Sequence, residues 1–301
     1  MGKKFHKILG IGIIAAGLLL FLYPDIRTFL FNRETQHTVE EFEESFVTDA
    51  AGSREDSTKE SLLSEVRSYN AEIYENGQEN FRDAWSVTQT PLVLDGLNDG
   101  LFGYLEIPAM EIKLPLYAGA TVSHMAEGAA ILGETSLPVG GENTNSVIAG
   151  HRGYRGAPYF RDIEKLQPGD LVILTNPWGT LYYQMESAAV IAPDDSDAVK
   201  IQEGRDMITL LTCHPYRSHG KYRYVVYCTR TDGPQQAEEG QNGELQDGGW
   251  LEPDDGILFE SSQNDIRMEQ LVRQCGAWMI GIMAVLTVVR KLIRKKNHDG
   301  F

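Results

Sequence analysis

The sequence predicts an all-β domain, a barrel or a sandwich, in the middle of the chain. Short β-rich runs follow one another there, and Gly, Pro and Asn separate them, which is the pattern of such folds. Strands do not alternate with helices, and there is neither a Gly-rich phosphate loop nor an internal repeat. The runs are residues 101–108, 110–117, 129–134, 145–151, 170–176, 179–192, 206–214 and 222–230.

Composition limits what this domain can do. The 301 residues, 42% of them hydrophobic, allow one ordinary domain with appendages. A net charge of −16 argues against nucleic acid as a partner, because phosphate binding needs basic patches. Three cysteines cannot form a disulfide framework.

Two apolar runs frame the chain. Residues 8–23 carry no charge and follow three lysines, and residues 275–289 precede five basic residues. Lys and Arg gather on the cytoplasmic side of spanning helices. We therefore expect two transmembrane helices in contact with membrane lipid, with both ends of the chain inside and residues 31–270 outside.

The remaining segments are polar. A helix is expected over about 58–76, because Leu62, Leu63, Val66, Tyr69 and Ile73 recur at helical spacing. An acidic stretch without Lys or Arg follows the β-rich region, which favours a flexible linker. The expected division is a tail and anchor (1–30), a polar helical segment (31–96), the β domain (97–232), the linker (233–270), and a second anchor and tail (271–301).

Cys213 is the candidate nucleophile. It lies near the end of an apolar run, a predicted strand, and a loop follows. A rigid strand would therefore hold its thiol beside a loop, where catalytic groups tend to lie. His151 ends another apolar run between glycines, and an imidazole can accept the proton of an attacking thiol. His219 is a rival to His151, whereas His214 alternates to the opposite face from Cys213. A cysteine that only packs in the core stays an alternative at this point.

Arg223 opens the run that follows the loop after Cys213. A guanidinium beside the nucleophile would stabilise an oxyanion and orient a substrate carbonyl. Arg217 and Lys221 of the loop are competitors. No metal or other cofactor is expected, because Cys213, His214, His219 and Cys228 lack zinc-ligand spacing.

Together these segments resemble the sortase family. Residues 209–213 (TLLTC) are similar to its TLxTC signature and residues 149–153 (AGHRG) to its GHRG segment, and Arg223 falls where the family places its arginine. The resemblance implies a sortase-like closed β-barrel with short helices. It also implies a cysteine transpeptidase with Cys213, His151 and Arg223 in the catalytic roles.

A finer resemblance points to class C, the pilin-polymerising sortases. Residues 112–117 and 135–141 and the two apolar runs are similar to that class. Asp83-Ala84-Trp85 is similar to its lid, in which Asp83 would meet the catalytic arginine and Trp85 would cover Cys213. The class has proline more often at the middle lid position, and residues 218–223 are about one residue longer than its pattern.

What the resemblance implies is a two-step transfer at a Gram-positive-type cell surface. Cys213 would cleave an LPxTG-like sorting signal of a pilin or surface protein, and an amine would resolve the thioacyl intermediate. That amine would be a pilin lysine in class C, or cell-wall peptide in a housekeeping sortase. The sequence leaves room for two further functions, a hydrolytic cysteine protease and a non-catalytic pilus-assembly scaffold.

Overall fold

A computed structural model describes residues 2–49, 55–81, 98–154, 157–218, 220–233 and 261–298. It divides into two compact units. One unit holds residues 22–260, and the other pairs residues 1–21 with residues 261–301.

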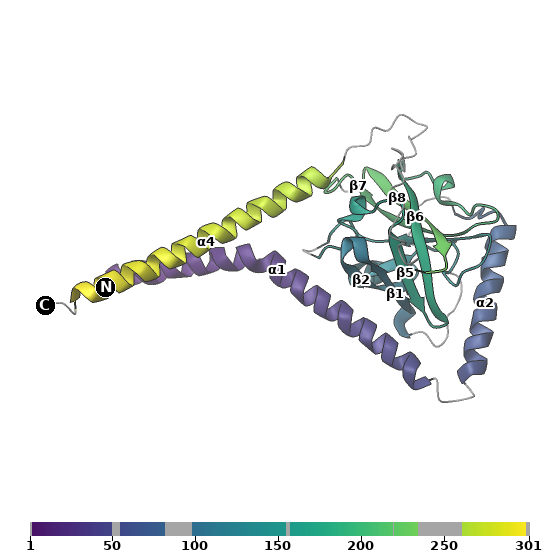
Figure 1. Cartoon of the computed structure of the whole chain (residues 1–301), viewed down its shortest axis with the longest axis horizontal. Helices are drawn as coiled ribbons and strands as arrows, with labels where there is room; N and C mark the ends of the chain where they lie inside the picture. Colours follow the sequence, from purple (N-terminus) through teal and green to yellow (C-terminus); the bar gives the residue numbers. More distant parts are fainter. Residues whose placement is uncertain are drawn as a thin grey trace, which may run out of the picture. The chain divides into compact units, whose positions relative to one another are not determined.

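Eight strands of the larger unit close into a barrel (Figure 1), in the order β1-β2-β3-β4-β7-β8-β6-β5. They match the eight runs that the sequence predicts, and of the two predicted arrangements the barrel is confirmed. The strands are β1 (Leu101–Ile107), β2 (Ile112–Ala118), β3 (Ala129–Ile131), β4 (Thr144–Ala149), β5 (Leu171–Asn176), β6 (Gly179–Ile191), β7 (Asp206–His214) and β8 (Tyr222–Thr231).

Side chains alternate between the two faces of the barrel wall. One buried cluster draws on all eight strands and fills the interior; from β4, β7 and β8 it includes Ile148, Leu210 and Tyr224. The next residue along each strand, such as Leu211 or Val225, belongs to a second cluster on the outer face. Because successive strand residues point to opposite faces, position along a strand decides which face a residue occupies.

The connections between the strands include only short helices. Within the part of the chain that the structure describes, they are α3 (Val122–Glu127) and the 3-10 turns η2 (Pro108–Met110), η3 (Ile163–Lys165) and η4 (Asp197–Val199), and a further 3-10 turn, η1 (Asn98–Gly100), directly precedes β1. The predicted combination of a β-barrel with short helices is thus confirmed.

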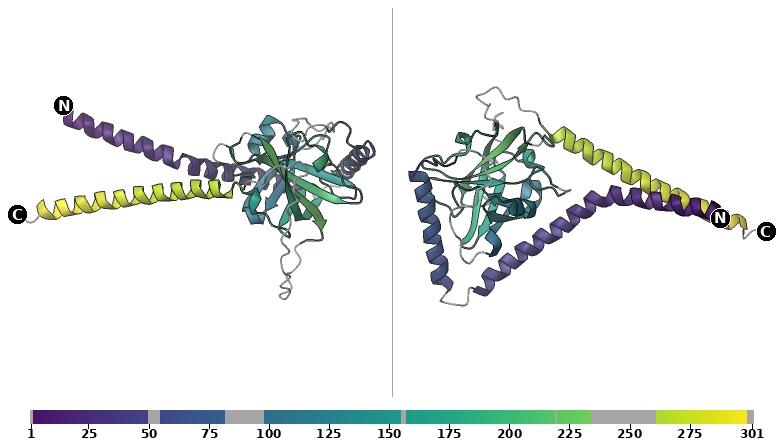
Figure 2. Two further views of the ribbon diagram at one scale, coloured as in Figure 1. Left: turned by 90° about the horizontal axis from the view of Figure 1, so that it is seen from above. Right: turned by 180° about the vertical axis from the view of Figure 1, so that it is seen from behind.

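Helix α2 (Glu55–Glu75) packs against the side of the barrel, as Figure 2 shows. It matches the helix predicted for residues 58–76. Val66 is fully buried, and the Asn70 side chain accepts from the Leu137 amide at 2.8 Å and donates to its carbonyl at 2.9 Å. Helical spacing therefore identified a face that the barrel covers.

Helix α1 (Gly2–Asp49) extends well beyond the predicted first anchor. The sequence placed residues 31–49 in a polar helical segment without a specific helix there, and the structure shows that this part of α1 lies on the barrel. Val39 and Phe42 are buried, and the Phe31 ring lies 4.6 Å from the Tyr159 ring, centroid to centroid. Apolar residues three or four positions apart form this face, but the charged residues between them hide it in the sequence.

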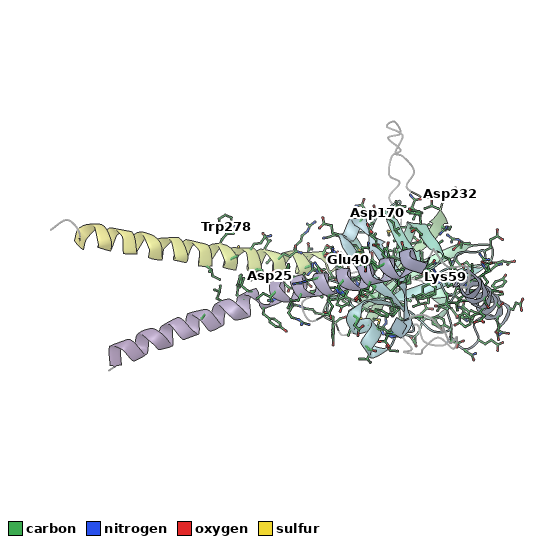
Figure 3. All side chains as sticks on the ribbon, turned by 90° about the horizontal axis from the view of Figure 1, so that it is seen from below. Asp25, Glu40, Lys59, Asp170, Asp232 and Trp278 are labelled. Carbon is green, nitrogen blue, oxygen red and sulfur yellow. The ribbon has the colours of Figure 1, made fainter. Side chains whose placement is uncertain are left out.

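The smaller unit contains the first part of α1 and helix α4 (Gln263–His298). The two helices approach closely, since a Cβ added at Gly276 would lie 2.6 Å from the Phe21 ring. Trp278 projects from α4 and is 74% exposed (Figure 3). Within the described residues, no helix combines the length and apolar character needed to cross a bilayer. Most of the predicted linker, residues 234–260, lies outside the described residues.

Candidate active site

The parallel pair β4 and β7 brings His151 level with Cys213. Ala149 on β4 is in register with Leu211 on β7, and the Gly150 amide continues the ladder by donating to the Leu211 carbonyl at 3.0 Å. Two residues further along each strand are His151 and Cys213. They share the outer face of the wall, because each lies two positions beyond an outward-facing residue.

The antiparallel pair β7 and β8 places Arg223 directly opposite Cys213. Arg223 is 7% exposed, and its Nη1 donates to the Gly220 carbonyl at 2.7 Å. Gly220 lies over both groups: a Cβ there would lie 3.2 Å from the Cys213 sulfur and 2.8 Å from Arg223 Nη1. A glycine is favoured here, since a φ of +83° strains other residues and a Cβ would displace the Arg223 guanidinium or the sulfur.

A side-chain hydrogen bond ties the two catalytic strands together at this rim. Thr212 Oγ1 donates to the Gly150 carbonyl at 2.7 Å, so the residue before the cysteine holds the residue before the histidine. Gly150 itself packs on the Phe160 ring, and a Cβ there would come within 2.7 Å of that ring. These contacts fix the backbone on which His151 stands.

The rival residues lie elsewhere. His214 points into the barrel and is 1% exposed. Arg217 is exposed, with its guanidinium 5.2 Å from the Tyr216 ring centroid, and Lys221 is likewise exposed, over the Tyr222 ring. His219 lies outside the described residues, as do the predicted lid residues Asp83 and Trp85. Of the arginines in this part of the sequence, geometry brings Arg223 to Cys213.

Aromatic rings enclose the histidine. The His151 ring stacks on Tyr154 with centroids 4.4 Å apart, and the Tyr159 ring meets it edge-on at 5.8 Å. Tyr159 is held by its hydroxyl, which donates to the Ala126 carbonyl at 2.6 Å. Burial among these groups lowers the pKa of His151, because desolvation disfavours the imidazolium form.

Burial has the opposite effect on the thiol. It raises the pKa of Cys213, and the positive charges of Arg223 and Arg152 partly offset that rise. Both shifts therefore favour a protonated sulfur and a neutral imidazole. Arg152 was not singled out in the sequence, although it directly follows His151.

Among the described residues, no group of three or more His, Cys, Asp and Glu side chains could hold a metal ion. Cys228, the other cysteine of the barrel, is fully buried in the interior, and burial raises the pKa of its thiol. Cys213 is thus the accessible thiol of the barrel, beside an imidazole and a guanidinium on a rigid wall. This arrangement defines the class of protein: a β-barrel cysteine enzyme equipped for acyl transfer.

Comparisons with known proteins agree with this class of protein. The sortase domain model matches residues 105–231. The chain is 34% identical to the sortase C of Clostridium perfringens SM101, covering 65% of this chain and 99% of that one with a TM-score of 0.55. It is 28% identical to sortase C1 of GBS Pilus Island 1, covering 68% and 96% with a TM-score of 0.58. It is also 24% identical to sortase D of Bacillus subtilis, covering 74% of this chain and 98% of that protein.

The chain belongs to the sortase family. Sortases are cysteine transpeptidases, so the sequence-based prediction of an enzyme of this kind is confirmed. The solved structures named above are sortases C, in agreement with the predicted class C.

The burial of Cys213 predicts a pH dependence. Because its thiol pKa is raised, the reactive thiolate is scarce at neutral pH and increases as pH passes the raised pKa. Alkylation of Cys213 by iodoacetamide should keep accelerating at a pH where a free cysteine peptide has already levelled off. Rates measured across the alkaline range in a Cys275→Ser background, with the additional Cys213→Ala change as the unlabelled control, test this. A midpoint below that of the free peptide would contradict the burial argument.

Proposed function

We propose that this sortase polymerises pilins, with Cys213 as nucleophile, His151 as acid and base, and Arg223 as oxyanion stabiliser. The observation that carries the proposal is the alignment of three neighbouring strands, which brings all three side chains to one rim of the barrel. The donor substrate is a pilin or surface protein with an LPxTG-like sorting signal. The acceptor is a pilin lysine.

In the first step, Cys213 attacks the threonine carbonyl of the sorting signal. His151 takes the thiol proton, since the resting thiol is neutral, and then delivers it to the departing glycine amine. Arg223 faces the oxygen on which negative charge develops, and because the residue is buried its guanidinium acts with little screening by water. The C–N bond breaks and a thioester to Cys213 remains.

In the second step, the acceptor amine attacks the thioester carbonyl. His151 removes a proton from that amine, an isopeptide bond forms, and the sulfur leaves and recovers its proton. One amide is exchanged for another, so the reaction needs no nucleotide or metal. Splitting the transfer through a covalent intermediate replaces one difficult step by two easier ones.

Two similar enzymes support the substrate and the acceptor. The sortase C of C. perfringens has been solved with the C-terminal cell wall sorting motif, which supports a sorting-signal donor here. A sortase C of Group B Streptococcus is pilus-related, which supports polymerisation rather than attachment to cell-wall peptide.

Replacing the nucleophile tests the enzymatic proposal. Cys213→Ala should abolish cleavage of an LPxTG peptide and pilin ladders, because no thioester can form. Mass spectrometry of the wild-type products should find the threonine carbonyl joined to the acceptor amine.

Two results would contradict this proposal. Polymers built by the Ala variant would favour a non-catalytic scaffold. A product that carries only added water, with acceptor amine in excess, would favour a protease. Cys228→Ala is the matched control, since that thiol is buried and should leave turnover unchanged.

The lid is a further part of the proposal. In it, Asp83 pairs with the catalytic arginine and Trp85 covers the thiol, so that substrate must displace both. Asp83→Ala and Trp85→Ala should therefore each speed alkylation of Cys213 several-fold at fixed pH, whereas Arg82→Ala next to the lid should not. Equal labelling rates in all four proteins would restrict the tripeptide to a structural role.

Anchoring by two membrane helices is the finer part of the predicted location. It is supported by the two apolar runs, 8–23 and 275–289, and by the basic residues that flank each run on the side of the nearer chain terminus. Single cysteines placed at Lys4 and Ser261 in a Cys213→Ala/Cys228→Ala/Cys275→Ser background report the topology. A membrane-impermeant maleimide on intact cells should label the cysteine at position 261 and spare the one at position 4. The reverse pattern, or recovery of the full chain without membranes, would exclude the proposed anchoring.

A further inference from the structure

Three ionisable side chains meet inside the barrel, directly beneath the candidate active site. They are Arg152, Glu164 and His214, here called the Glu164 cluster. The side chains of Arg152 and Glu164 are 3% and 2% exposed, and that of His214 is 2% exposed. None of them takes part in the proposed catalytic steps.

Glu164 is the common partner in this cluster. Its Oε1 accepts a hydrogen bond from Arg152 Nη2 and lies 3.6 Å from His214 Nδ1. The Arg152 guanidinium carbon lies 5.4 Å from the centroid of the Tyr224 ring, which also faces His214 at 5.7 Å. The arginine therefore has a carboxylate on one side and an aromatic face on another.

Strand alternation explains why the cluster lies where it does. Arg152 follows His151, His214 follows Cys213 and Tyr224 follows Arg223, so each points to the inner face while its neighbour points outward. The 3-10 turn η3 brings Glu164 to them from a separate segment. The neighbouring charges of that segment are engaged with one another, since Arg161 and Lys165 both pair with Asp162.

A buried ion pair is a poor source of stability by itself. Desolvating two charges costs about as much as their attraction returns, and replacing such a pair by uncharged residues is often neutral or stabilising. The placement of this pair has a second consequence, because the Arg152 charge acts on Cys213 through the barrel wall and lowers its thiol pKa, with Arg223 the larger influence. Charges this deeply buried are little screened by salt.

We propose that Arg152 is a positioning residue of the transfer reaction, held by Glu164, which fixes the backbone beside His151 and Cys213 and keeps a permanent positive charge behind the sulfur. The inference rests on the proposed role of Cys213. The ionisable groups around the sulfur are then Arg223 from β8 and His151 after β4 on its own face of the wall, and Arg152, His214 and Glu164 on the inner face.

The deciding variant removes both charges of the pair and keeps their approximate volume. In Arg152→Met/Glu164→Gln the fold has no unpaired buried charge, and the glutamine retains hydrogen-bonding groups for His214. We expect a cooperative thermal transition, an alkylation midpoint of Cys213 moved to higher pH, and labelling at neutral pH slowed about five- to tenfold. The kcat for peptide transfer should fall at least tenfold with little change in KM.

Arg161→Met is the matched control, since it removes an arginine of the same region that pairs with Asp162 instead. It should leave the alkylation profile unchanged. A folded double variant with the wild-type profile and kcat would overturn the proposal and leave the pair a packing feature.

Arg152→Lys tests the proposed roles of Arg152 even if the double variant does not fold. Lysine keeps the charge but lacks the planar fork that meets Glu164 and Tyr224 together. The expected result is a wild-type alkylation profile with a reduced kcat. An alkylation profile shifted from wild type would show that the Arg152 charge does not set the reactivity of Cys213. A wild-type kcat would show that Arg152 does not position the site. Alkylation needs no peptide substrate, so these outcomes stay distinct from a failure of Cys213→Ala to block transfer.

Discussion

The hydrogen-bonded register of β4, β7 and β8 is the constraint on which the rest of the site depends. Ala149 opposite Leu211, and Cys213 opposite Arg223, bring segments about 60 and 10 residues apart to one row. A slip of one residue on any of the three strands would turn that strand's side chain to the other face. Burial of both faces of these strands makes such a slip costly, because Leu210 and Leu211 would exchange environments.

The same wall separates two electrostatic environments. On the outer face, burial raises the pKa of the Cys213 thiol and lowers the pKa of the His151 imidazole, so both groups are biased towards their neutral forms. On the inner face, Arg152 and Glu164 meet in the packed interior. Strand alternation joins the two, since each candidate catalytic residue is one peptide bond away from an interior partner.

Loops and a helix outside the barrel wall pack around the candidate site residues. Gly220, in the loop between β7 and β8, lies over the Cys213 sulfur and the Arg223 guanidinium. The Tyr154 and Tyr159 rings pack against the His151 ring. Phe31 of α1 packs on Tyr159, so a part of the predicted polar helical segment supports the aromatic surroundings of His151. The barrel provides rigidity, and these additions limit how water reaches the thiol.

The sequence by itself determined the eight strands and helix α2 and named Cys213, His151 and Arg223 as candidate site residues, because these depend on local patterns: apolar runs ended by turn residues, helical spacing and short motifs. The barrel-facing half of α1 was missed, since its few apolar positions lie among charges. Only the tertiary structure distinguished Arg223 from Arg217 and Lys221, which are all near Cys213 in sequence. It alone revealed Glu164 as the partner of Arg152, because that contact depends on how η3 returns to the barrel. Register and long-range approach are properties of the closed barrel, and no local pattern encodes them.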